Sequence, residues 1–291
     1  MKLIGYTCTF NEAGMVPYVM PYVERMGYDK FIVYDNMSTD NTVELLSKYP
    51  FVEIRYYDTN GKFDDNAKRQ KEIDGYVECY KMAKVGTPEE EVIWMTFTDF
   101  DEVIFGGYGD GAIKEILNCS YIFEGYNCFF EQMVNLLPPK DEQCELYKRM
   151  EYENKPLVHT IDGVRGVWCY GNMAKPTMFC VNDFNYMAFV QGNHYAVCKT
   201  REGKKIRNLS ENTGFTPFHL KFISKEKLKK KWSNYDERGL AFYGKDLDKI
   251  ETHYRDYLYP MSFSLENYFL NKGLKNIVRD TENTSGLKLD I

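Results

Sequence analysis

The first hundred residues alternate between strand patterns and helix patterns, and this alternation most restricts how the chain can fold. Runs of apolar, β-branched and aromatic residues at 2–10, 30–36 and 52–57 are each followed by polar residues and then by a helical pattern. A fourth run, "EVIWMTF" (91–97), closes this part of the chain. Such alternation is typical of a parallel sheet with helices on both faces.

The segments between these runs carry the signals of helices. After the first run, apolar residues recur at helical spacing, with Pro17 in the first turn, where its missing N–H is tolerated. Ser38 or Asp40 is expected to cap the second helix. The third helix is expected to bury one face, made of Ile73, Val77, Tyr80 and Ala83.

Beyond residue 110 the pattern changes. Short strand patterns at 126–135 and 175–181 mix with aromatic-rich loops, which indicates an antiparallel extension of the sheet. From residue 224 the sequence "SKEKLKKKWSNYDERG" is typical of a charged helix. We therefore predict an α/β fold with a Rossmann-like, mixed but mostly parallel sheet flanked by helices, followed by a C-terminal helical extension.

Charge and cysteine content limit the class of protein. The net charge of −6 argues against a general nucleic-acid binder, which needs a basic face. The eight cysteines include no C-x-x-C pair, so free thiols in a reducing compartment are expected. There is no signal-peptide pattern and no run of about 20 apolar residues. A cytoplasmic location is expected, with peripheral membrane contact through Lys229, Lys230 and Lys231 as an alternative to a solvated helix face.

Polar clusters follow the ends of three predicted strands. These are Asn11-Glu12, Asp35-Asn36 and Asp99-Phe100-Asp101. Because the carboxyl ends of parallel strands meet at one edge of a sheet, and ligands collect there, we expect the three clusters to converge.

The Asp99-x-Asp101 pair offers two hard oxygen ligands for Mg²⁺ or Mn²⁺, since such an ion needs few protein ligands when phosphates and water supply the rest. A metal at this place would neutralise the charge that develops on a departing diphosphate. The competing interpretation is that two aspartates end a strand simply because turns favour Asp.

The stretches "CTFNEAGMVPYVMPYVERMGYDKFIVYDNMSTDNTVELL" and "WMTFTDFDEVIF" resemble the start of glycosyltransferases of the GT-A fold, in the family 2-like and family 92-like group. The resemblance rests on N-E, D-N-x-S-x-D-x-T and D-x-D-E, each after a strand, and covers about the first 105 residues. It implies a GT-A domain over 1–223, with a nucleotide-binding half at 1–105, an acceptor half at 106–223, and the extension at 224–291 packed on it.

The resemblance also implies an activity, the transfer of a sugar from a nucleoside diphosphate-sugar to a glycan or polysaccharide acceptor. The implied reaction inverts the anomeric carbon and depends on Mn²⁺ or Mg²⁺ as cofactor. A UDP-sugar is the favoured donor. The implied metal ligands are Asp99, Asp101 and His219. The implied nucleotide-sugar contacts are Thr9, Asn11, Glu12, Asp35, Asn66, Arg69, Asp99, His194 and Lys221. For Asn66 and Arg69 an exposed helix position is the competing interpretation.

An inverting reaction needs a base for the acceptor hydroxyl. Glu131, an acid within the apolar run "FFEQMVN", is the first candidate, because burial would raise its pKa. Asp162 and Asp183 are its rivals.

Three other functions compete for the same residues. A sugar-phosphate nucleotidyltransferase would need a glycine-rich basic loop after the first strand, and "TFNEAGMVP" does not provide one. A phosphatase using D-x-D-x-T is excluded by Val103. A non-catalytic glycan-binding protein of the same fold remains open on sequence grounds.

Overall fold

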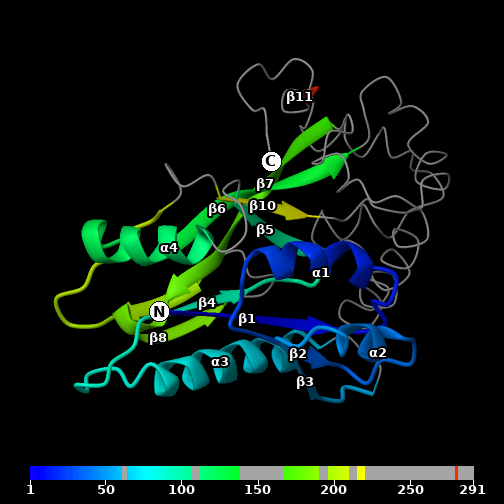
Figure 1. Ribbon diagram of the computed structural model, residues 1–291, viewed down its shortest axis with the longest axis horizontal. Coiled ribbons are helices and arrows are strands. Elements are labelled where there is room, and N and C mark those ends of the chain that lie inside the picture. The colour runs from blue at the N-terminus through cyan, green and yellow to red at the C-terminus, as the bar shows by residue number, and fades with distance from the viewer. Residues whose placement is uncertain are drawn as a thin grey trace, which may run out of the picture. The chain divides into compact units, whose positions relative to one another are not determined.

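A computed structural model describes seven stretches of the chain (Figure 1): residues 1–60, 64–106, 112–137, 167–189, 196–209, 215–219 and 279–280. The chain divides into two compact units. The first is built from Met1–Met133 and Gly171–Phe218, and the second from Val134–Tyr170 and His219–Asp290. Apart from residues 279–280, the predicted extension at 224–291 lies outside the described residues and stays a prediction.

The N-terminal half forms a parallel sheet from strands β1 (Lys2–Thr9), β2 (Lys30–Asp35), β3 (Val52–Tyr56) and β4 (Ile93–Phe97). Strand β1 pairs in parallel with both β2 and β4, and β2 pairs in parallel with β3. This order, β3-β2-β1-β4, confirms the predicted parallel sheet. Each observed strand lies within the run that predicted it.

The sheet continues from β4 with strands β7 (Val167–Cys180), β6 (Cys128–Leu137), β10 (Phe215–His219) and β5 (Glu102–Gly106), in that spatial order. Strand β7 runs antiparallel to β4, with Cys180 opposite Trp94. Strands β8 (Phe184–Phe189) and β9 (Ala196–Thr200) form a separate antiparallel pair. The predicted antiparallel extension is therefore confirmed. In the second unit, β11 (Arg279–Asp280) pairs with the start of β7.

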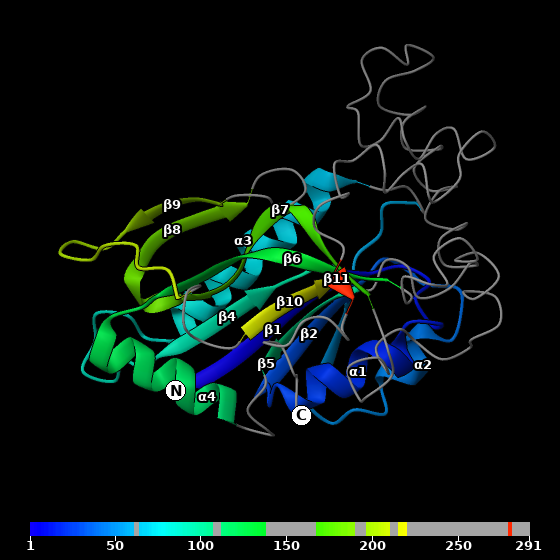
Figure 2. The ribbon, with the colours of Figure 1, turned by 90° about the horizontal axis from the view of Figure 1, so that it is seen from above.

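Helices cover both faces of the sheet (Figures 1 and 2). Helix α3 (Asp65–Met82) lies on one face, where its residues share a core with Ile4, Tyr6 and Met95. Helix α4 (Ala112–Cys119) and the end of α1 (Val16–Arg25) lie on the other face, in a core with Leu3 and Trp94. A short helix, α2 (Thr42–Leu46), precedes β3. No helix of the described residues combines the length and apolarity that a membrane span needs.

The buried face of α3 differs in part from the predicted one. Val77 is 40% exposed, whereas the buried residues are Glu72, Gly75, Tyr76 and Cys79. The close approach of helix and sheet decides this orientation, because a Cβ atom on Gly75 would lie 2.9 Å from the ring of Tyr6. The Tyr76 hydroxyl also donates to the Phe184 carbonyl at 2.7 Å. Of the predicted residues, Ala83 is fully buried and Tyr80 packs partly buried against the same core, so aliphatic spacing was wrong for Val77 and right in part for this face.

The six cysteines whose side chains the structure describes are all unpaired, as the spacing predicted. Burial raises the pKa of Cys79 and of Cys180 to about 12, so both thiols stay protonated at neutral pH. Cys119 is exposed, so burial is not common to all of them.

Candidate active site at the carboxyl edge of the sheet

The pairing of the strands brings the three polar clusters to one edge. Thr9 at the end of β1 lies opposite Asp35 at the end of β2, and β4 runs parallel to β1 and ends just before Asp99 and Asp101. The arrowheads of β1 and β4 point the same way in Figure 2. This confirms that the clusters converge, and parallel α/β sheets bind ligands at this edge.

Asp35 is fully buried and firmly held. The Thr9 hydroxyl donates to one of its carboxylate oxygens at 3.3 Å, and the Ser38 backbone N–H donates to the other at 2.8 Å. The Ser38 hydroxyl donates a further hydrogen bond to Asp35. Charge-assisted hydrogen bonds of this kind fix a carboxylate in one orientation. The ends of β1 and β2 are thereby joined through the Asp35 side chain.

Asn11 ties the loop after β1 to the loop after β2. Its backbone has a φ of 53°, a left-handed conformation that Asn tolerates better than most residues. Its N–H donates to the Ser38 hydroxyl at 2.8 Å, and its side-chain oxygen accepts from the Thr39 N–H at 2.7 Å. Next to it, the Glu12 N–H donates to the Thr42 hydroxyl at 2.7 Å. Asn11 therefore has a clear scaffolding role at this edge.

The capping prediction for α2 is wrong in part. Its N-cap is Asn41, whose side chain makes no capping hydrogen bond. Asp40 accepts from the Thr42 N–H at 3.0 Å and from the Ala13 N–H at 3.2 Å, so it does satisfy one first-turn donor. Ser38 does not cap the helix because Asp35 and Asn11 engage its hydroxyl.

Asp99 begins a tight turn between β4 and β5. Its carbonyl accepts from the Glu102 N–H at 2.9 Å, and its own N–H donates to the Glu102 carboxylate at 3.1 Å. Asp101 and Glu102 are buried, with 7% and 4% exposure, whereas 38% of the Asp99 side chain is exposed. Among these three acids, Asp99 therefore offers the most accessible carboxylate.

Lys68 of α3 reaches Asp99 and forms an ion pair with it. Burial by itself lowers the pKa of Lys68, but the charges of Asp99 and Glu72 and the hydrogen bond to Asp99 outweigh it and raise the pKa. Lys68 is therefore an ammonium ion at neutral pH. Glu72, one turn further along the helix, is fully buried. A lysine between two acids thus supports the turn that carries Asp99.

Sequence reasoning missed Lys68 and Glu72. It selected Asn66 and Arg69 on the same helix, and the structure shows Asn66 exposed and bonded through its side-chain oxygen to the Arg69 guanidinium. The available signal was the Lys68–Glu72 spacing of four residues on the side of α3 that also carries Tyr76. Such pairs are usually solvated, so the signal is weak.

The chemistry of Asp99 and Asp101 fits a hard divalent ion, because carboxylate oxygens are the ligands that Mg²⁺ and Mn²⁺ prefer. Within the residues that the structure describes, no group of three or more His, Cys, Asp or Glu side chains is arranged to hold a metal. The backbone of the third predicted ligand, His219, lies on β10, and its side chain is outside the described part.

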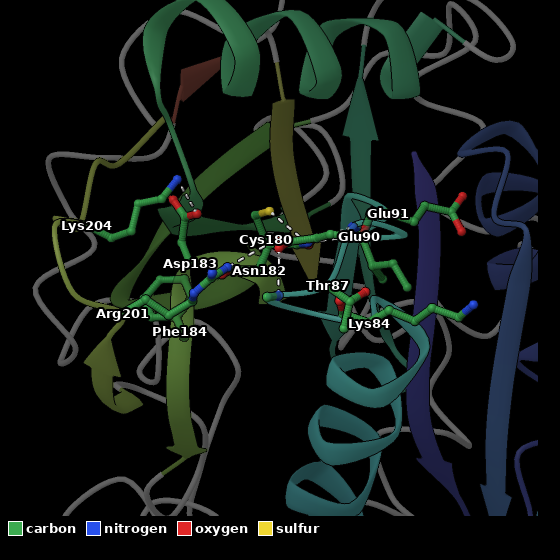
Figure 3. Close-up of polar contacts among 12 residues, drawn as sticks. Lys84, Thr87, Glu90, Glu91, Cys180, Asn182, Asp183, Phe184, Arg201 and Lys204 are labelled. Atoms are coloured by element: carbon green, nitrogen blue, oxygen red, sulfur yellow. Dashed lines mark hydrogen bonds and ion pairs between the residues drawn. The ribbon is translucent and has the colours of Figure 1, made fainter.

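Asp183 lies at the opposite edge of the sheet, as the antiparallel pairing of β7 with β4 requires. It is 2% exposed and accepts hydrogen bonds from the Tyr121 hydroxyl at 2.8 Å and the Asn127 amide at 2.9 Å. It also forms an ion pair with Lys204 at 2.8 Å (Figure 3). This placement corrects the proposal of Asp183 as a base for chemistry beside Asp99, because Asp183 anchors loops at the far edge.

The other predicted residues fall outside what can be described. Glu131 lies on β6, with its side chain outside the described part. Asp162, His194 and Lys221 lie outside the described residues altogether.

Comparison with known proteins identifies the class. The family model of glycosyltransferase family 92 matches residues 9–149, a span that includes Asp35, Lys68 and Asp99. The protein is a glycosyltransferase, with the α/β fold of that class. The matched region, slightly less than half of the chain, is similar to the family 92 domain.

Solved structures are similar at low identity. A crystal structure of S. aureus TarS 1-349 has 14% identity and a TM-score of 0.37, over 92% of this chain and 74% of that chain. A second crystal structure of S. aureus TarS has 14% identity and a TM-score of 0.39, over 92% of this chain and 45% of that chain. The 4-diphosphocytidyl-2C-methyl-D-erythritol synthase of Anaerococcus prevotii has 12% identity and a TM-score of 0.23, over 48% and 56%. No curated protein sequence matches the chain.

Proposed function

We propose that the protein transfers a sugar, with inversion at the anomeric carbon, from a nucleoside diphosphate-sugar to a glycan or polysaccharide acceptor. A UDP-sugar is the favoured donor, and Mn²⁺ or Mg²⁺ the cofactor. One observation carries the proposal: the buried Asp35 and the Asp99–Asp101 turn lie at the same carboxyl edge of a parallel sheet.

Asp35 suits the nucleoside part of the donor. An ionised carboxylate only accepts hydrogen bonds, which matches the N–H and O–H groups of a base and a ribose. Because this carboxylate is fully buried, the side chains that cover it must move for a donor to contact it. Thr9 and Ser38 already hold it in one orientation. Such preorganisation lowers the entropic cost of binding the donor.

Asp99 and Asp101 suit the diphosphate part. When bound between them, a divalent ion would neutralise the charge that the leaving diphosphate acquires. Lys68 positions Asp99 and adds one positive charge to a turn that carries three acids within four residues. Without that charge, ionising neighbouring carboxylates in a partly buried turn would be costly.

The acceptor hydroxyl must lose its proton as it attacks. Glu131 remains the first candidate for this base and Asp162 the second, while Asp183 is removed from consideration by its place in the fold. His194, His219 and Lys221 remain proposed contacts of the donor or its metal.

The proposal can be tested by incubating the full chain with a panel of UDP- and GDP-sugars, with Mn²⁺, Mg²⁺ or EDTA, and measuring release of the nucleoside diphosphate. We expect release from one donor class, dependent on the added metal and faster with oligosaccharide acceptors. Release of inorganic pyrophosphate from a nucleoside triphosphate and a sugar phosphate would indicate a nucleotidyltransferase instead.

A further inference from the structure

Three of the large apolar side chains that are exposed in the first unit lie on two segments that contact each other. Helix α4 continues into a π-helical turn, η1 (Ser120–Glu124), in which Ile122 is 60% and Phe123 is 81% exposed. Ile206, in the loop after β9, is 57% exposed. Single exposed apolar residues are ordinary, but several side by side mark an interaction surface.

The two segments that carry these residues lie against each other. The Asn127 N–H donates to the Arg207 carbonyl at 3.0 Å, and the Asn127 side chain donates to the Lys205 carbonyl at 2.8 Å. The Arg207 guanidinium lies 5.2 Å from the centre of the Tyr126 ring, and the Lys204 ammonium lies 5.3 Å from that of Tyr121. The loop at 204–207 therefore packs along the segment that follows η1.

This loop is strongly basic although the protein is acidic. The stretch "KTREGKKIR" (199–207) has five Lys or Arg residues against one acid, Glu202, in a chain with a net charge of −6. Lys205 and Arg207 are exposed. The neighbouring η1 turn adds one exposed acid, Glu124. Arg201 and Lys204 form ion pairs with Glu90 and Asp183. Lys205 and Arg207, the cations that flank the exposed Ile206, lie outside these two pairs.

The root of the loop is fixed (Figure 3). The Arg201 guanidinium donates to the Asn182 carbonyl at 2.8 Å and to the Glu90 carboxylate at 3.0 Å. Lys204 pairs with the buried Asp183. These contacts hold the loop against the sheet, so Lys205 and Ile206 are presented on a formed surface rather than on a loose segment.

We propose that the surface formed by Ile122, Phe123, Lys205, Ile206 and Arg207, here called the basic–apolar surface, docks on an anionic lipid bilayer. Apolar side chains can enter the boundary between headgroups and acyl chains while neighbouring cations meet lipid phosphates. Charge complementarity favours this occupant, because an acidic protein approaches an anionic bilayer only through a basic face.

The basic–apolar surface lies away from the candidate active site. The Asn127 carbonyl accepts from the Cys180 N–H at 2.8 Å, and Cys180 lies opposite Trp94, near the start of β4. Asp99 follows the other end of that strand. Docking therefore leaves the carboxyl edge uncovered, and it does not depend on the proposed sugar transfer.

The test is sedimentation of the full chain with vesicles of phosphatidylcholine, with and without phosphatidylglycerol. We expect binding only to the anionic vesicles, weakened by added salt. The variants Phe123→Ser/Ile206→Ser and Lys205→Glu/Arg207→Glu should each lower the partition coefficient by about tenfold or more. Tyr56→Ser, which removes an exposed aromatic residue from β3, is the matched control and should bind like the wild type.

Unchanged melting temperatures would show that the variants remain folded. Absence of binding to anionic vesicles would overturn the proposal, as would equal binding by the surface variants and the Tyr56→Ser control. Self-association of the wild type that the same substitutions abolish, without vesicle binding, would instead assign the surface to a second copy of the chain. The vesicle experiment does not measure sugar transfer. Absence of vesicle binding would therefore leave the proposed function unaffected.

Discussion

Lys68 on α3 and Asp99 in the turn after β4 form an ion pair that joins a helix to the candidate donor site. The lysine is largely buried, with 14% of its side chain exposed, whereas 38% of the Asp99 side chain is exposed. A residue on the helix therefore controls the position and the electrostatic environment of the most accessible acid at that edge.

Replacing Lys68 should affect both activity and stability. Lys68→Met leaves Asp99 and Glu72 without their shared cation, so we expect kcat/KM for the donor to fall by tenfold or more and the free energy of unfolding to fall by about 1–3 kcal/mol. Steady-state kinetics and urea denaturation measure the two effects. Lys71→Met on the same helix, which removes a surface pair with Asp74, is the control. Equal kcat/KM values and equal unfolding free energies for the two variants would show that Lys68 does not support the donor site.

Asp35 should matter to the fold as well as to the donor. Asp35→Ala leaves the partly buried Ser38 N–H and the buried Thr9 hydroxyl without their acceptor, which should cost about 2–4 kcal/mol of unfolding free energy. Asp35→Asn keeps one acceptor oxygen, so it should cost less while still weakening donor binding. Calorimetric titration with the donor measures the loss of donor affinity separately from the loss of stability. Asp58→Ala, which replaces an exposed acid in a loop, should leave the free energy of unfolding and the donor affinity unchanged. An equal loss of stability and affinity in Asp58→Ala would contradict the specific role of Asp35.

Replacing Asp183 tests whether this residue stabilises the fold or acts as the catalytic base. Asp183→Asn should lower the free energy of unfolding by about 1–3 kcal/mol, because it weakens the hydrogen bonds that the buried Asp183 accepts and its ion pair with the exposed Lys204. The turnover number per folded molecule should stay near that of the wild type. Loss of turnover by several orders of magnitude in a stable variant would return Asp183 to the candidate bases.

Stability in acid should depend on Glu78. The hydrogen bond from Arg55, followed by the Arg55 charge, holds the pKa of Glu78 below its ordinary value of 4.5 in the folded protein. A lowered pKa contributes stability above the unfolded value, and this contribution is lost as the pH falls through the folded pKa. Melting temperatures of Glu78→Gln should therefore depend less on pH than those of the wild type below about pH 4.5. An equal pH dependence of the melting temperature in the two proteins would show that the Arg55–Glu78 pair contributes no stability.

Local sequence signals were enough to predict the first four strands and their parallel pairing. Each strand is a dense apolar run bounded by polar residues, so its limits are set by the residues themselves. The convergence of Asp35 and Asp99 followed from the geometry of parallel sheets and needed no side-chain detail.

Other features depend on tertiary contacts that spacing does not reveal. The buried side of α3 is decided by Gly75 against Tyr6, and its buried acid, Glu72, resembles a solvated residue in sequence. Asp183 was proposed as a base because a strand pattern gives no direction, and the antiparallel run of β7 against β4 places it at the edge opposite Asp99. Lys68 was missed because its partner, Asp99, is 31 residues away.

We propose that Asp99 and Asp101 bind the diphosphate of a nucleotide-sugar through a divalent ion. The most direct measurement is the Mn²⁺-dependent rise in melting temperature with the cognate donor, for the wild type and for Asp101→Asn. We expect a rise of several degrees for the wild type and none for Asp101→Asn, with equal melting temperatures of the two proteins in the absence of ligands. An undiminished, Mn²⁺-dependent rise in Asp101→Asn would contradict this proposal.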